Sequence, residues 1–105
     1  MSEASAVTDI DDDQVRVTTW TFDAVGDATG PHVHEYDYVV VPVTGGRFTV
    51  ADSEGTTREM TQETATPYRG IAGTAHNVIS STGSRVVFVE VELKRSRSHR
   101  RLAPR

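Results

Sequence analysis

Short runs rich in valine and threonine, separated by turns that contain glycine or proline, extend through most of this 105-residue chain. Branched Cβ atoms favour extended backbone, and no apolar pattern of helical period lasts longer than a turn. The expected strands are residues 14–22, 32–43 (bent near Pro42), 47–51, 56–60, 76–79 and 85–93, with tight turns at 44–46 and 52–55. Strands this short must close on themselves or pair with another chain to cover their edges. The sequence therefore predicts an all-β fold, a small antiparallel barrel.

The last expected strand carries two different faces. Alternation places Val87, Val89, Val91 and Leu93 on one face, and Phe88, Glu90 and Glu92 on the other. We expect the valine face to belong to the core. The glutamate face then points either to solvent or into a partly polar interior.

Charge is distributed unevenly along the chain, although its net value is only −4. Residues 1–13 contain five acidic and no basic side chains, and residues 94–105 contain six basic and no acidic ones. Neither end has apolar periodicity, so we expect one domain over 14–93 between two flexible charged segments. The basic end could contact nucleic acid or an acidic partner. A solubilising tail is favoured, because no nucleic-acid-binding motif accompanies it.

Composition excludes several functions. The chain has no cysteine, which excludes disulfides, thiolate catalysis and zinc–thiolate sites and leaves histidine and carboxylates as the strong metal ligands. No apolar run approaches the length of a membrane span, and the N-terminus lacks the pattern of a signal peptide, so a cytoplasmic location is expected. There is no phosphate-binding glycine loop, dinucleotide fingerprint or nucleophile elbow.

Three of the four histidines form a pattern that suggests a metal site. His32 and His34 are two apart in an expected strand, so both side chains lie on one face and can direct neutral nitrogens at one point. His76 opens another strand and could complete a set of three imidazoles with open positions for water or substrate. A His-X-His pair alone is weak evidence, because it can merely pack. His99, in the basic end, is expected to take no part.

The spacing around these histidines resembles the first motif of the cupin superfamily. Gly26 is followed by five residues, the pair His32 and His34, three residues, Tyr38, six residues and Gly45. Every spacing fits, and the departure is Tyr38, where the motif has glutamate. Of the second motif, Gly73 and His76 match, whereas Ala65, Ile71 and Ser80 differ.

The resemblance, which spans residues 14–93, implies an antiparallel double-stranded jelly roll, often a homodimer. It also implies one divalent transition metal ion (Fe, Ni, Zn, Mn or Cu) bound by His32, His34 and His76. Cupins include dioxygenases, isomerases, lyases and non-enzymatic binding proteins, so the fold does not give the function.

Without the motif's glutamate, three neutral imidazoles would leave the full charge of +2 on the ion, which favours anionic ligands. Tyr38 could donate a hydrogen bond to a metal-bound ligand or act as a weak acid, or it could simply fill the barrel. Alternation turns Glu35 and Asp37 away from the histidines. Glu90 or Glu92 could supply a carboxylate if their face points inward.

Two further residues could line the pocket. Arg69 could pair with a substrate carboxylate, and Tyr68 could stack on the substrate. Both residue types more often lie at a surface or rim.

We expect a metal-dependent enzyme of the dioxygenase, isomerase or lyase type that acts on a small polar or anionic molecule, with His32, His34 and His76 as ligands and Tyr38 and Arg69 assisting. The alternatives are a non-catalytic binding module that uses the same cavity and a structural protein in which the histidines only pack. The substrate is a small molecule; a membrane partner is not expected and nucleic acid is disfavoured.

Overall fold

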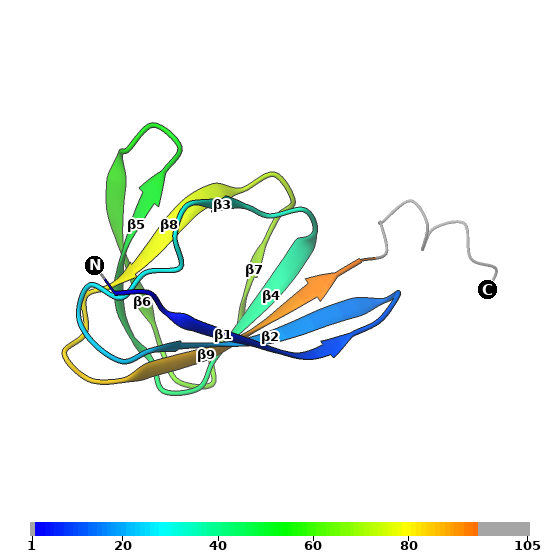
Figure 1. The fold of residues 1–105 in the computed structure, drawn as a ribbon, viewed down its shortest axis with the longest axis horizontal. Helices are drawn as coiled ribbons and strands as arrows, with labels where there is room; N and C mark the ends of the chain where they lie inside the picture. The colour runs from blue at the N-terminus through cyan, green and yellow to red at the C-terminus, as the bar shows by residue number, and fades with distance from the viewer. Residues whose placement is uncertain (1, 95–105) are drawn as a thin grey trace.

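The computed structural model describes residues 2–94 as nine β-strands in two sheets (Figure 1). The strands are β1 (Ser5–Asp11), β2 (Val15–Phe22), β3 (His32–Val33), β4 (Asp37–Pro42), β5 (Gly46–Asp52), β6 (Thr57–Gln62), β7 (Tyr68–Gly70), β8 (Ala75–Ser80) and β9 (Val86–Leu93). One sheet has the order β1-β2-β9-β4-β7 and the other β3-β8-β5-β6, and all neighbouring strands are antiparallel. The expected all-β jelly-roll fold is confirmed. The sheets remain open rather than joining into a closed barrel.

The core lies between the two sheets. Its buried apolar side chains are Phe22, Tyr38, Val40, Phe48, Val78, Val86 and Phe88. Phe22 is central: its ring meets that of Phe48 edge-on, with centroids 5.2 Å apart, and that of Phe88 at 5.6 Å. Such aromatic contacts stabilise a core beyond the area they bury.

The β5–β6 hairpin, green in Figure 1, projects beyond the rest of the molecule. Its turn depends on Asp52, whose Oδ1 accepts hydrogen bonds from the backbone N–H groups of Glu54 and Thr56 at 2.9 and 3.0 Å. Gly55 has φ +86°, a conformation that favours glycine. The expected turn over 52–55 is confirmed.

The prediction of a flexible segment over residues 1–13 is wrong for most of its length. Residues 5–11 form the edge strand β1, which pairs with β2 from Ser5↔Thr21 to Asp11↔Arg16. Every β1 side chain is exposed, so the strand is held by backbone pairing and not by an apolar pattern. The predicted basic tail, with His99, lies outside the described residues apart from Lys94.

The prediction that the valines of β9 face the core is also wrong. Val86, Phe88 and Glu92 are buried, whereas Val87, Val89, Val91 and Leu93 on the opposite face are only half-buried. The five-stranded sheet therefore directs its glutamates into a partly polar interior, because that face lines the site described below.

The single extended segment expected over 32–43 is divided in two. β3 ends at Val33 and β4 begins at Asp37, and the two strands belong to different sheets. This break carries the chain from one sheet to the other next to the histidines. No helix in residues 2–94 is long and apolar enough to cross a membrane.

Candidate metal centre

Strand pairing brings the three histidines together. In the β3–β8 ladder, His32 lies directly opposite His76. The pairing continues past β3, where the His34 N–H donates to the Thr74 carbonyl at 2.9 Å. His34 is two residues from His32 and therefore lies on the same face.

The three imidazoles converge through their Nε2 atoms. His34 Nε2 lies 3.2 Å from His32 Nε2 and 3.0 Å from His76 Nε2. Two nitrogens bound about 2.1 Å from one ion are about 3.0 Å apart at an angle of 90° and about 3.4 Å apart at the tetrahedral angle. The separations fit a divalent ion bound on one face of an octahedron, which leaves open positions for other ligands.

A hydrogen bond behind His32 fixes the orientation of its ring. Its Nδ1 lies 2.8 Å from the Gly30 carbonyl oxygen, which can only accept, so Nδ1 carries the proton. Nε2 then presents its lone pair to the other imidazoles. Metal-binding histidines commonly have such a partner on the second nitrogen.

The surroundings keep His34 and His76 neutral. The pKa of each is lowered to about 4, first by burial and then by the neighbouring imidazoles. Neutral imidazole is the form that binds metal. The residues present therefore fit the metal ion that the sequence predicts.

Tyr38 lies directly against the cluster. Its ring stacks on His34 with centroids 3.8 Å apart and planes 19° apart, and its side chain is buried. The other face of the ring covers Gly70, where an added Cβ would lie 2.0 Å from Tyr38 Cζ. Tyr38 thus holds His34 in place, and only a glycine at position 70 leaves room for its ring.

The interior face of β9 adds two carboxylates. Glu92 is paired with Arg16, whose Nε and Nη2 donate to Oε1 and Oε2 at 2.6 and 2.9 Å. Glu90 Oε2 lies 3.8 Å from His34 Nε2. The pKa of Glu90 is raised to about 7, first by burial and then by the neighbouring Glu92. The sequence predicts a carboxylate from Glu90 or Glu92 only if their face of the strand points inward, and it does.

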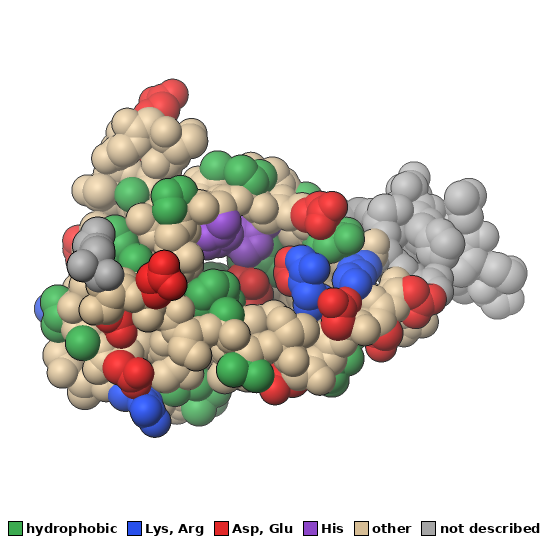
Figure 2. All heavy atoms as spheres, in the orientation of Figure 1, with side chains coloured by type: hydrophobic (Ala, Val, Ile, Leu, Met, Phe, Trp, Pro, Cys, Tyr) green, Lys and Arg blue, Asp and Glu red, His purple; other side chains and the backbone are tan. Residues whose placement is uncertain are grey.

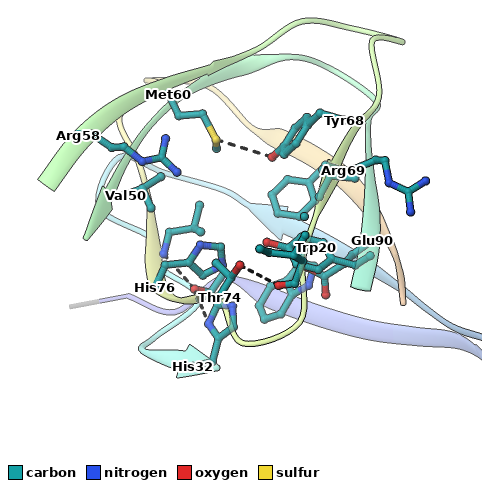
Figure 3. A pocket seen from close by; sticks show the side chains of 17 residues that line it. Trp20, His32, Val50, Arg58, Met60, Tyr68, Arg69, Thr74, His76 and Glu90 are labelled. Atoms are coloured by element: carbon teal, nitrogen blue, oxygen red, sulfur yellow. Dashed lines mark hydrogen bonds between the residues drawn. The ribbon is translucent and has the colours of Figure 1, made fainter. Parts of the chain in front are cut away.

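A cavity of about 380 Å³ opens beside the histidines. Figure 2 shows the histidine side chains in the hollow, and Figure 3 shows the residues around it. Apolar side chains such as Trp20, Val50 and Met60 form much of the wall. The cavity is of the size and character of a small-molecule site.

Two arginines line this cavity, the predicted Arg69 and Arg58, which was not predicted. Both are exposed, so they lie at its mouth. Figure 3 shows the Arg69 guanidinium directed away from the histidines. Arg58 pairs with Val50 across β5 and β6, and Val50 is buried, so both side chains lie on the interior face. Tyr68 also lines the cavity, and its hydroxyl accepts a hydrogen bond from Gln62 Nε2 at 2.9 Å.

The remaining predictions about carboxylates agree with the structure. Glu35 is exposed, and Asp37 Oδ1 accepts a hydrogen bond from the Ala72 N–H at 2.9 Å. Neither belongs to the histidine cluster. Arg58 was not identified from the sequence as a cavity residue. Arg58 and the half-buried Met60 are two residues apart in one strand, so their side chains lie on the same face, and this spacing could have indicated that Arg58 points inward.

A jelly roll in which three imidazoles converge beside an internal cavity could hold a metal ion, and comparison with known proteins gives the family. No family model matches the chain. A cupin domain from Bordetella pertussis is 37% identical, covers 90% of this chain and 96% of its own, and superposes with a TM-score of 0.84. The chain belongs to the cupin superfamily.

Two further relatives are informative. The beta-alanine degradation protein BauB of Pseudomonas aeruginosa is 41% identical over 92 residues, which are 88% of this chain and 95% of that protein. The polyketide cyclase RemF of Streptomyces resistomycificus is 20% identical with a TM-score of 0.65, over 89% of this chain and 66% of its own, which is a likeness of fold alone.

Proposed function

We propose that this protein is a metal-dependent enzyme that acts on a small carboxylate in the cavity beside His32, His34 and His76. The observation that carries the proposal is the convergence of three imidazole Nε2 atoms at a cavity of about 380 Å³, with that of His34 3.2 and 3.0 Å from those of His32 and His76. A divalent ion held there would act as a Lewis acid on a substrate oxygen. The reaction belongs to the dioxygenase, isomerase or lyase type.

The protein's own residues supply recognition and proton transfer. Arg58, at the mouth, can pair with a carboxylate in a bidentate way. Tyr38, on the wall beside His34, can donate a hydrogen bond to the bound molecule or act as a weak acid. Trp20 and Met60 exclude water from the interior. The name of the relative BauB makes β-alanine, a small amino carboxylate, the first compound to test.

The first experiment measures metal content. The untagged protein, purified without chelator, is compared with the His32→Ala/His76→Ala double variant by elemental analysis. We expect close to one transition metal ion per wild-type chain and none in the variant. A wild type that contains no metal and binds none of the added Fe, Ni, Zn, Mn or Cu refutes the proposal.

Carboxylate recognition is tested by thermal shift on the metal-loaded protein. β-Alanine and propionate should stabilise the wild type, whereas propylamine should not. Arg58→Gln should abolish the shift, and Arg69→Gln, the matched control, should keep it. Equal shifts in both variants would contradict the role of Arg58.

A non-catalytic binding role for the same cavity is the alternative, favoured by the largely apolar surface of its wall. It predicts the same ligand-dependent stabilisation without turnover. Loss of turnover in a folded His34→Ala variant supports the enzyme. Stabilisation by a ligand that is recovered unchanged supports the binding module.

We further propose that the protein is a homodimer that pairs the outer faces of its five-stranded sheets. The half-buried aliphatic residues on this face are Val15, Val17, Val39, Val41, Val87, Val89, Val91 and Leu93, and the more exposed ones are Val7 and Ile10. Four strands about 4.8 Å apart and about 26 Å long give roughly 500 Å² of flat area. Two such faces reach the roughly 1,000 Å² that a specific interface needs.

A second copy is the occupant that suits this face, because the same apolar surface serves both partners of a two-fold dimer. Light scattering after gel filtration should give twice the chain mass for the wild type. Val91→Lys, in the middle of the face, should give a monomer, and Val25→Lys, in an exposed loop, should leave the dimer intact. A monomeric wild type, or a dimeric folded Val91→Lys, refutes the interface.

A further inference from the structure

Two interior glutamates face the metal site from β9, and their surroundings differ. The Glu92 carboxylate forms two hydrogen bonds with Arg16 and is neutralised by it. Glu90 is nearly as well buried, with 12% of its side chain exposed. Within residues 2–94, no lysine or arginine nitrogen lies within 4.0 Å of its carboxylate. Its polar neighbours are the Trp20 side chain, which hydrogen-bonds to it, and His34 at 3.8 Å.

A buried carboxylate without a cation is costly. The neutral His34 beside it offers no positive charge, and Arg16 is already occupied by Glu92. A divalent ion held by the three imidazoles would supply that charge. Carboxylate oxygens bind Fe, Mn, Ni and Zn together with imidazole nitrogens.

The register of the sheet explains why the carboxylate can come from β9. The cupin motif expects its glutamate on β4, where this chain has Tyr38. Tyr38 pairs with Glu92, and Val40 pairs with Glu90, so Glu90 lies on the neighbouring strand and the same interior face. The Tyr38 ring stacks on His34 and lies against Gly70, so this position contributes no carboxylate.

We propose that Glu90 is the fourth protein ligand of the metal centre, in place of the glutamate missing at Tyr38. This inference rests on the proposed metal site. The carboxylate would lower the net charge of the centre from +2 to +1. The separation of 3.8 Å from His34 Nε2 can close to about 3.0 Å by rotation of the Glu90 side chain.

The test compares the wild type, Glu90→Gln and the matched control Glu35→Gln, which removes an exposed carboxylate next to His34. Each protein, stripped of metal, is titrated with Co²⁺ against a competing chelator, and the visible spectrum of the Co²⁺ form is recorded. Glu90→Gln should bind Co²⁺ about ten-fold or more weakly and show shifted d–d bands. Glu35→Gln should match the wild type in both. Thermal melts of the metal-free proteins verify folding.

The outcomes separate this inference from the proposed function. Tight binding by the wild type with unchanged affinity in Glu90→Gln refutes the role of Glu90 and leaves the three-histidine site standing. Weaker binding with an unchanged spectrum refutes direct ligation, because the ligand set is then the same. A wild type that binds no Co²⁺ refutes the metal site itself. If Glu90→Gln does not fold, infrared difference spectra of the wild type decide: a carboxylate band that shifts on adding Co²⁺ supports ligation, and its absence overturns it.

Discussion

Replacing Gly70 by alanine should damage both the fold and the metal site. An alanine Cβ at this position would lie 2.0 Å from Tyr38 Cζ and 2.4 Å from Cε1 and Cε2, whereas ordinary contacts are about 3.5–4.0 Å. The Tyr38 ring must therefore move by about 1.5 Å or more. It is 5% exposed and stacked at 3.8 Å on His34, so it cannot move without displacing the imidazole.

Overpacking of this kind costs about 1–3 kcal/mol. For a domain of this size, each kcal/mol lowers the melting temperature by about 4–8 °C. Displacement of His34 should in addition weaken the binding of Co²⁺ by about ten-fold or more. The assays are thermal denaturation of the metal-free protein and Co²⁺ titration.

Gly83→Ala is the matched control, because an added Cβ there meets no atom within 4 Å and the backbone is not left-handed. It should change neither stability nor affinity. Adding Tyr38→Ala to Gly70→Ala should remove the clash, so the double variant should be more stable than the sum of the two single effects predicts. Equal stability of Gly70→Ala and Gly83→Ala, within about 0.5 kcal/mol, would refute the reasoning.

Two further predictions concern charge in the interior. The metal-free protein should gain stability from pH 4.5 to 6.5: His34 and His76, with pKa values of about 4, favour the folded state as pH rises, and Glu90, with a pKa of about 7, opposes them. Folding then releases about one proton in this range, so the free energy of unfolding should rise by about 1.4 kcal/mol per pH unit. In Glu90→Gln this rise should be about twice as steep. A free energy of unfolding, measured by urea denaturation, that does not change over this pH range would contradict the prediction. Arg16→Met should destabilise the fold by about 3–5 kcal/mol, because it leaves Glu92 buried without its cation, and Arg16→Met/Glu92→Leu should recover most of that loss; equal stabilities of the two variants would contradict it.

The sequence predicted the fold class and the histidine cluster, since both depend on local patterns. Alternation places His32 and His34 on one face whatever the strands around them do. Turn chemistry fixes the hairpin around Asp52 in the same way. His76 needed the spacing of a family motif, because its position opposite His32 is a long-range pairing.

The same reasoning failed for β9, where the more apolar face of the strand lies outside the core. β9 alternates valines with Phe88, Glu90 and Glu92, and burial energy alone favours placing the valines inside. The structure has the glutamates inside because Arg16 neutralises Glu92. That partner lies 76 residues away and cannot be found from the pattern of β9 alone. The half-buried outer valines are then available for a second chain.

The edge strand β1 and the mouth residue Arg58 were missed for a related reason. Neither has a local apolar pattern: β1 is exposed throughout and is held by backbone bonds to β2. The direction of Arg58 follows from its pairing with the buried Val50. The consequence of Tyr38 also depends on such non-local contacts. Along the chain, tyrosine stands where the cupin motif has its glutamate. In three dimensions the Tyr38 ring, made possible by Gly70, stacks on His34, and under the proposal above the carboxylate would come from Glu90 on the neighbouring strand, which has no lysine or arginine nitrogen within 4.0 Å in residues 2–94.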